Sequence, residues 1–214
     1  MRQYKLELPT EANALSGREK GVTNLSPHHV LETPLTPPYP EGYQTLVLGL
    51  GCFWGAERLF WNLPGVHTTA VGYAGGFTPN PSYQEVCTGL TAHTEVVKVV
   101  FDPEKLDLEE LLKIFWESHD PTQSMRQGND IGTQYRSAIY WQYPEHENSI
   151  RSSMSAFQTE LNKSNKGVIQ TELRLCDDFY FAEDYHQQYL SKNPNGYCGL
   201  AGTGVCFPRA KENA

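Results

Sequence analysis

The chain of 214 residues lacks long apolar runs, an excess of basic residues and a high cysteine content. No apolar stretch approaches the ~20 residues that a membrane-spanning helix needs, and residues 1–15 lack the apolar core of a signal peptide. Lys and Arg number 17 against 25 Asp and Glu, so the formal net charge is −8. This balance opposes binding to nucleic acid or to an anionic membrane. We therefore expect a cytoplasmic protein with neither of these partners, and nothing in the sequence demands more than a monomer.

Cysteine is scarce, and its number is odd. Five cysteines are too few for a disulfide scaffold, and at least one of them stays unpaired within a monomer. In a reducing compartment such residues are structural thiols, metal ligands or reactive groups. The neighbours of each cysteine have to distinguish these roles.

Proline is unevenly distributed. Six of the 14 prolines fall within residues 1–44, where they disfavour long helices and central strands. We interpret residues 1–44 as a Pro-rich N-terminal extension packed on the domain surface, with a docking segment for a partner as the alternative. Residues 45–192 are predicted to form one compact domain. Residues 193–214 are predicted to be a flexible, Gly-rich C-terminal tail.

Hydrophobic periodicity predicts alternating strands and helices in the compact domain. Apolar or alternating runs predict strands at 45–50, 66–73, 93–101, 133–141 and 167–175. Helical spacing predicts helices at 53–63, 83–87, 107–115, 144–162 and 181–190. Residues 121–132 are expected to be a loop. With short connections, this order favours helices packed on a mixed sheet, in an α+β or α/β sandwich.

Cys52 lies between the first predicted strand and the first predicted helix. A helix N-terminus carries free N–H groups and a partial positive charge, so a thiolate there is stabilised and its pKa is expected to fall. Gly51 and Gly55 leave the sulfur open to approach. We interpret Cys52 as reactive, with a buried structural thiol as the alternative. Phe53 and Trp54 are either core residues or walls of a small apolar pocket.

Two further cysteines, Cys198 and Cys206, lie in the glycine-rich tail. A mobile thiol suits disulfide exchange, in which one sulfur has to reach another. A permanent disulfide and half of a metal site are the alternatives, although no metal-ligand spacing accompanies the pair. With Cys52 they predict a relay of three thiols, in which the oxidation passes from Cys52 to Cys198 and then to Cys206. Cys87 and Cys176 lie in ordered segments and are predicted to be structural.

Four residues are candidates for acid–base catalysis or for hydrogen bonding to a substrate. Glu95 shares one face of its predicted strand with valines. If that face is inward, desolvation raises the pKa of Glu95 and makes it a candidate general acid; an exposed strand end is the equal alternative. Asp130 has the local surroundings of a turn residue. Tyr83 and Tyr135 carry hydroxyls that could bind an oxygen atom.

Eight motifs follow one another between about residues 46 and 208. They are Gly51-Cys-Phe-Trp-Gly-Ala-Glu57, Gly72-Tyr-Ala-Gly-Gly76, Pro79-Asn-Pro-Ser-Tyr83, His93-Thr-Glu95, Gly128-Asn-Asp130, Thr133-Gln-Tyr-Arg-Ser137, His186-Gln-Gln-Tyr189 and Asn195-Gly-Tyr-Cys198. In this order they resemble the type A peptide methionine sulfoxide reductases. The Pro-rich arm and the second tail cysteine are similar to the longer bacterial members, which use three cysteines.

The resemblance implies a fold, a reaction and a set of partners. The fold would be a ferredoxin-like two-layer α+β sandwich, with Cys52 at the start of its first helix. The enzyme would reduce methionine-S-sulfoxide, free or in oxidised proteins, and thioredoxin would be its reductant. No metal and no organic cofactor would be required.

The resemblance also implies a role for each site residue. The catalytic residues would be Cys52, Glu95, Cys198 and Cys206. Those that bind the substrate would be Phe53 and Trp54 at the S-methyl group and Tyr83, Asp130 and Tyr135 around the sulfoxide oxygen. Cys52 would become a sulfenic acid, form a disulfide with Cys198, and be released when Cys206 attacks Cys198.

Two other functions remain open at this point. A cysteine hydrolase would combine Cys52 with His93 or His186 as the base and Asp130 as the residue that orients it. It leaves the two tail cysteines unexplained. A non-enzymatic redox-sensing module would use the relay as a switch, and it leaves the glutamate and the aromatic residues around Cys52 unexplained. His119 and His186 are otherwise expected at the surface or behind the site.

Overall fold

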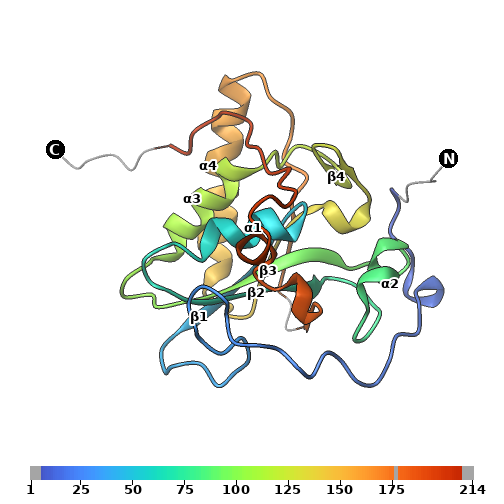
Figure 1. Ribbon diagram of the computed structural model, residues 1–214. Helices are drawn as coiled ribbons and strands as arrows, with labels where there is room; N and C mark the ends of the chain where they lie inside the picture. The colour runs from blue at the N-terminus through green and yellow to red at the C-terminus, as the bar shows by residue number, and fades with distance from the viewer. Residues whose placement is uncertain (1–5, 176–177, 209–214) are drawn as a thin grey trace.

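A computed structural model describes residues 6–175 and 178–208 (Figure 1). Its centre is a mixed six-stranded sheet with the order β7-β6-β1-β3-β2-β8. All neighbouring pairs are antiparallel except β6 and β7, which are parallel. The strands are β1 (Gln44–Leu50), β2 (Val66–Ala74), β3 (Thr94–Phe101), β6 (Ser137–Trp141), β7 (Glu172–Leu175) and β8 (Phe179–Phe181). The architecture is therefore α+β, with a mixed sheet as the sequence predicted.

Three helices cover one face of this sheet. They are α1 (Phe53–Phe60), α3 (Leu108–Ser118) and α4 (His146–Lys163). Their apolar sides join alternate residues of the central strands in the main hydrophobic core, which includes Phe60, Val97, Phe115 and Phe157. At the start of α3, the side chain of Asp107 accepts a hydrogen bond from the N–H of Glu110, as a helix cap requires.

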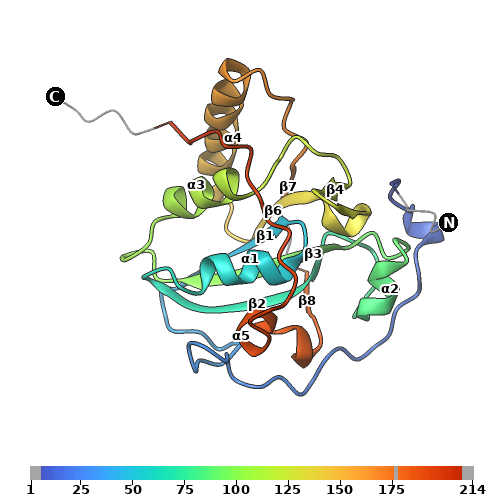
Figure 2. The same cartoon turned by 45° about the horizontal axis from the view of Figure 1, so that its top comes forward.

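On the opposite face, Phe179 of the edge strand β8 packs against buried residues of the central strands, and the N-terminal segment runs along the sheet in both views (Figures 1 and 2). Lys98 of β3 lies over the rings of Tyr39, Phe179 and Phe181, with its Nζ 5.5, 4.5 and 4.2 Å from their centroids. Between residues 6 and 43 the only regular element described is a short 3₁₀ helix, η1 (Glu11–Asn13). His28 and Leu35 of this segment are nevertheless buried.

Four predicted elements differ from the structure in class or by several residues. The strand predicted at 167–175 is limited to β7, which begins only at Glu172. The strand predicted at 133–141 is shorter, because η2 (Thr133–Tyr135) is a 3₁₀ helix and β6 begins only at Ser137. The loop expected at 121–132 contains the hairpin β4 (Arg126–Gln127) and β5 (Asp130–Ile131). The helix predicted at 181–190 is divided into β8, η3 (Asp184–His186) and α5 (Tyr189–Lys192). The aromatic residues of this last segment are spaced like those on one face of a helix. In the structure, Phe181 belongs to a strand, whereas Tyr189 stacks on Trp54.

The C-terminal segment contains no helix or strand among the described residues after Lys192. It crosses α1 and continues past α3 towards α4 (Figures 1 and 2). Leu200, Val205 and Phe207 pack against the main core. The N–H of Phe207 also donates to Oε1 of Glu117 at 2.6 Å. None of the helices within 6–175 and 178–208 is both long and apolar enough to cross a membrane.

Candidate active site

Cys52 lies between the end of β1 and the start of α1. It is the N-cap residue of α1, and its side chain is partly buried. Gly51 before it has φ +98°, and a Cβ there would lie 2.6 Å from Cβ of Gln127. Only glycine therefore allows the chain to turn out of the strand so close to Gln127.

Glu95 lies beside this helix start. It is 2% exposed, on the same inward face of β3 as Val97 and Val99. Its Oε2 accepts the N–H of Phe53 at 3.1 Å, so the carboxyl group is next to Cys52 in the fold. Burial raises the pKa of Glu95 to about 8, although the Phe53 N–H acts in the opposite direction. The inward alternative from the sequence is the correct one, and Glu95 is protonated at neutral pH.

The expected fall in the pKa of Cys52 is wrong. Burial raises the pKa of the Cys52 thiol, and Glu95 and Asp130 raise it further when they are ionised. The backbone amides of Trp54 and Gly55 act in the opposite direction but do not outweigh burial. A helix start is therefore not sufficient to create a thiolate where the sulfur is desolvated beside carboxyl groups.

Two tyrosines and Asp130 lie close to Cys52 and Glu95. Tyr83 begins α2 (Tyr83–Cys87), and Tyr135 ends η2. Burial raises the pKa of both hydroxyls, and Glu95 raises it further, so both remain hydrogen-bond donors at neutral pH. Burial also raises the pKa of Asp130, whose Oδ2 accepts the hydroxyl of Tyr197 at 3.3 Å. The structure thus brings together all four polar groups that the sequence singled out.

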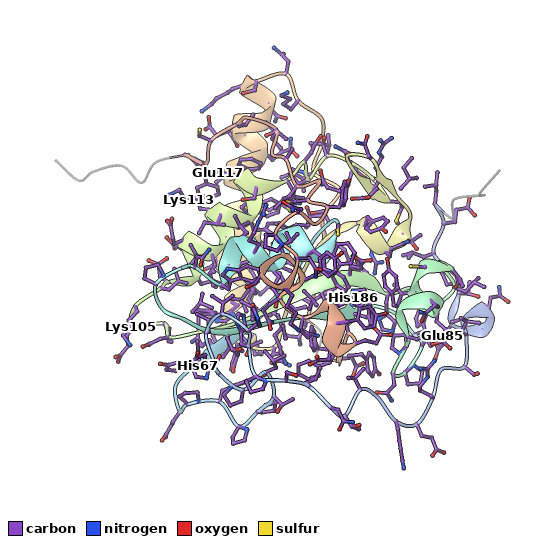
Figure 3. The ribbon with its side chains drawn as sticks, in the orientation of Figure 1. His67, Glu85, Lys105, Lys113, Glu117 and His186 are labelled. Atoms are coloured by element: carbon purple, nitrogen blue, oxygen red, sulfur yellow. The ribbon has the colours of Figure 1, made fainter. Side chains whose placement is uncertain are left out.

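Aromatic rings form the other side of the site. Phe53 is buried, whereas Trp54 is partly exposed. The Trp54 ring stacks on Tyr189 with centroids 3.9 Å apart, and its Nε1 donates to Nδ1 of His186 at 3.1 Å. The ring of His186, which is labelled in Figure 3, has its centroid 4.5 Å from that of the Tyr83 ring. Phe53 and Trp54 are therefore held in fixed positions next to Cys52.

A buried hydrogen-bond chain holds α1 against the N-terminal and C-terminal segments. Glu57 Oε2 accepts the N–H of Gln188 at 2.7 Å, and its Oε1 accepts the hydroxyl of Thr69 at 3.0 Å. Nε2 of His28 lies 2.9 Å from the same hydroxyl. Burial raises the pKa of Glu57 to about 7. Sequence reasoning assigned no role to Glu57, and the only signal was its place in the first motif.

The histidines are not arranged as a base for Cys52. The buried His93 accepts the N–H of Gly76 at Nδ1 and lies 2.7 Å from the carbonyl oxygen of Thr78 at Nε2. His186 is buried rather than at the surface, and its Nδ1 is occupied by Trp54. His119 is buried too. Neither His93 nor His186 is hydrogen-bonded to Cys52 in the part of the chain that the structure describes.

A scan against family models gives the decisive observation. Residues 44–206 match the model described as peptide methionine sulfoxide reductase. The chain belongs to this family. The match includes every element of the sheet and the three thiols of the predicted relay.

Individual relatives agree with the family match. The chain is 60% identical over 204 residues to a peptide methionine sulfoxide reductase of Rippkaea orientalis, covering 95% of this chain and 94% of the relative. It is also 60% identical to that of Azotobacter vinelandii, with coverage of 97% and 96%. A solved methionine sulfoxide reductase A of Corynebacterium diphtheriae has a TM-score of 0.85 and 47% identity over 95% of this chain and 100% of its own.

The other cysteines of this family member occupy different surroundings. Cys198 and Cys206 are exposed thiols of the tail. Cys87 ends α2 and is also exposed, beside Tyr83, whose pKa it helps to raise. This position argues against a structural role in the core. Cys176, which the sequence also indicated as structural, lies outside the described residues. Within the described ranges, no three His, Cys, Asp or Glu side chains are grouped to hold a metal ion.

Proposed function

We propose that this family member reduces methionine-S-sulfoxide, free or in oxidised proteins, by attack of Cys52 on the sulfoxide sulfur. The observation that carries the proposal is Glu95, a buried carboxyl group with a pKa of about 8 that lies next to the start of α1. A sulfoxide sulfur is a weak electrophile until its oxygen is protonated or strongly hydrogen-bonded. A carboxylic acid that keeps its proton at neutral pH supplies this assistance.

The first step transfers one oxygen atom. Glu95 protonates the sulfoxide oxygen and the Cys52 sulfur attacks the sulfur of the substrate, while the thiol proton of Cys52 passes to the Glu95 carboxylate. The S–O bond of the substrate then breaks, and the hydroxyl group moves to Cys52. Methionine leaves in the reduced thioether form, and Cys52 is oxidised to a sulfenic acid. Because the pKa of Cys52 is raised, its sulfur enters this step as the neutral thiol, and the Glu95 carboxylate left after proton donation is the group that accepts the thiol proton.

Substrate binding uses both sides of the pocket. We assign Phe53 and Trp54 to the S-methyl group, because their rings offer an apolar surface next to Cys52. Tyr83, Tyr135 and Asp130 lie around the sulfoxide oxygen in this proposal. The pKa values of both tyrosine hydroxyls are raised, which supports a role as donors to that oxygen.

Recycling uses the tail thiols. Cys198 attacks the sulfenic acid of Cys52, forming a disulfide and releasing water. Cys206 then attacks Cys198, and Cys52 leaves as the thiol. The Cys198–Cys206 disulfide is reduced by thioredoxin, and the exposure of both cysteines supports this assignment. The cycle suits the cytoplasm, where thioredoxin keeps thiols reduced, and needs only a monomer.

We also assign the core to the ferredoxin-like class. The elements β1, α1, β2, β3, α3 and β6 follow the βαββαβ order, and their strands lie in the order β6-β1-β3-β2 within the sheet. We also propose that the chain has three parts: the N-terminal extension 1–44, the catalytic domain 45–192 and the tail 193–214.

One experiment tests the reaction. The reduced protein is mixed with one equivalent of methionine-S-sulfoxide without a reductant, and the products are analysed by chromatography and mass spectrometry. We expect about one methionine per chain and a Cys52–Cys198 or Cys198–Cys206 disulfide. The R epimer of the sulfoxide is the control and should be left unchanged. Release of methionine without either disulfide would contradict the relay, and no methionine would contradict the reaction itself.

A further inference from the structure

Cys198 is not placed at random on the surface of the catalytic domain. A Cβ built on Gly55 would lie 3.0 Å from Sγ of Cys198 and 3.3 Å from Cβ of Leu200. The tail therefore crosses α1 where the helix has no side chain, at a residue three positions after Cys52. Any larger residue at position 55 would push the Cys198 sulfur away from the helix.

One cation is directed at this sulfur. Nη2 of Arg58 donates a hydrogen bond to Sγ of Cys198 at 3.1 Å. Arg58 follows Gly55 by three residues, a spacing that places two side chains next to each other on a helix. Together Gly55 and Arg58 form a shallow seat for the sulfur, which we call the sulfur cradle.

Arg58 has no other polar contact that would explain its position. It is exposed, and in the described part of the chain it takes part in no ion pair and in no other side-chain hydrogen bond. Several of the other described arginines are paired with carboxylates, as Arg151 is with Glu147 at 2.8 Å and Arg136 with Glu172 at 2.7 Å. The unpaired guanidinium of Arg58 is thus available to a developing negative charge.

The recycling step creates such a charge. When Cys198 attacks, an S–S bond forms and the S–O bond of the Cys52 sulfenic acid breaks. Cys198 is oxidised and the Cys52 sulfur is reduced. The thiol proton of Cys198 and the departing hydroxide form water. The attacking group is the thiolate, and a guanidinium hydrogen bond stabilises an anion more strongly than it stabilises a neutral thiol.

We propose that Arg58 is a catalytic residue of recycling: it holds the Cys198 sulfur in the sulfur cradle and stabilises its negative charge during attack on the Cys52 sulfenic acid. This inference rests on the proposed function, because it concerns a step of that cycle. Arg58 acts only after methionine has left. It therefore affects how fast Cys52 is recycled.

The test separates methionine release from disulfide formation. Wild type, Arg58→Met, Arg58→Lys and the control Arg151→Met are each mixed with one equivalent of methionine-S-sulfoxide without reductant and quenched in acid over time. Methionine and the Cys52–Cys198 peptide are both quantified. For Arg58→Met we expect the ratio of the disulfide rate to the methionine rate to fall about tenfold, as for one charge-assisted hydrogen bond. Arg58→Lys should recover most of the ratio, and Arg151→Met should match wild type.

Each outcome decides between the two proposals. A wild-type ratio in Arg58→Met, or equal losses in the Met and Lys variants, overturns the charge role of Arg58 and leaves the relay intact. If wild type itself releases methionine but forms no Cys52–Cys198 disulfide, the relay fails, and the inference fails with it. A lower ratio in Arg58→Met with recovery in Arg58→Lys supports both.

Discussion

The pocket at the start of α1 and the C-terminal tail both carry reactive cysteines, but their surroundings are opposite. In the pocket, Glu95 is almost fully buried, and Cys52 is partly buried between two strands and a helix. In the tail, Cys198 and Cys206 are exposed, and the described residues around them form no helix or strand. Two side chains labelled in Figure 3 mark these regions. His186 lies on the pocket side of α1, and Glu117 of α3 accepts the N–H of Phe207 in the tail.

The difference follows from what each step requires. Activating a sulfoxide needs an acid that is protonated at neutral pH, and removal from water raises the pKa of a carboxyl group that far. Thiol–disulfide exchange instead needs one sulfur to reach another and then to meet an external reductant. A rigid, dry site and an accessible tail therefore divide the cycle between them.

Removing one cysteine from each region gives the largest expected effects. Cys52→Ser should abolish methionine formation, because a serine hydroxyl is a much weaker nucleophile than a thiol. Cys198→Ser should still release about one methionine per chain and then stop with thioredoxin as reductant. Both are measured by chromatography of methionine against time, with circular dichroism to confirm folding. Continued thioredoxin-driven turnover of Cys198→Ser would contradict the division between pocket and tail.

Glu95→Gln tests the pocket alone and should give the next largest effect. Loss of the acid is expected to slow the single-turnover methionine burst about 100-fold, while the disulfide still follows each sulfenic acid formed. In wild type, the burst rate should fall as pH rises above about 8, because Glu95 then loses its proton. The glutamine variant cannot titrate, so its slow burst should show no such fall. Rapid-quench assays from pH 6 to 10 measure both, and an identical alkaline fall in the variant would remove Glu95 as the acid.

Removing one aromatic ring from α4 and one from the tail compares how much each ring contributes to the free energy of unfolding. The smallest expected effect is in the tail. Phe157 of α4 is fully buried, and the ring of Phe207 stacks on it with centroids 6.2 Å apart. Phe157→Ala should lower the free energy of unfolding by about 3–5 kcal/mol. Phe207→Ala should lower it by only about 1 kcal/mol, because its ring is partly exposed. Urea unfolding measures both, and equal losses would mean that the tail is as much a part of the core as α4.

Much of the fold could be predicted where one pattern dominates a segment. The alternating valines of β3 and the helical spacing of α1 gave elements close to those observed. Residues 181–190 were predicted to be one helix, but they begin in β8 and reach α5 only at Tyr189, because their aromatic residues face different partners. Phe179 packs against the second face of the sheet, whereas Tyr189 stacks on Trp54. Local spacing does not contain those partners.

The candidate site also has features that the sequence predicted and features that it could not predict. The sequence by itself determined the family, the candidate residues of both regions and the position of Cys52 at a helix start. Only the tertiary structure decided that Glu95 is buried, that the pKa of Cys52 is raised rather than lowered, and that Arg58 contacts the sulfur of Cys198. The reason is physical: a side chain's type and spacing are local, whereas its solvation and the charges around it come from segments far away in the chain.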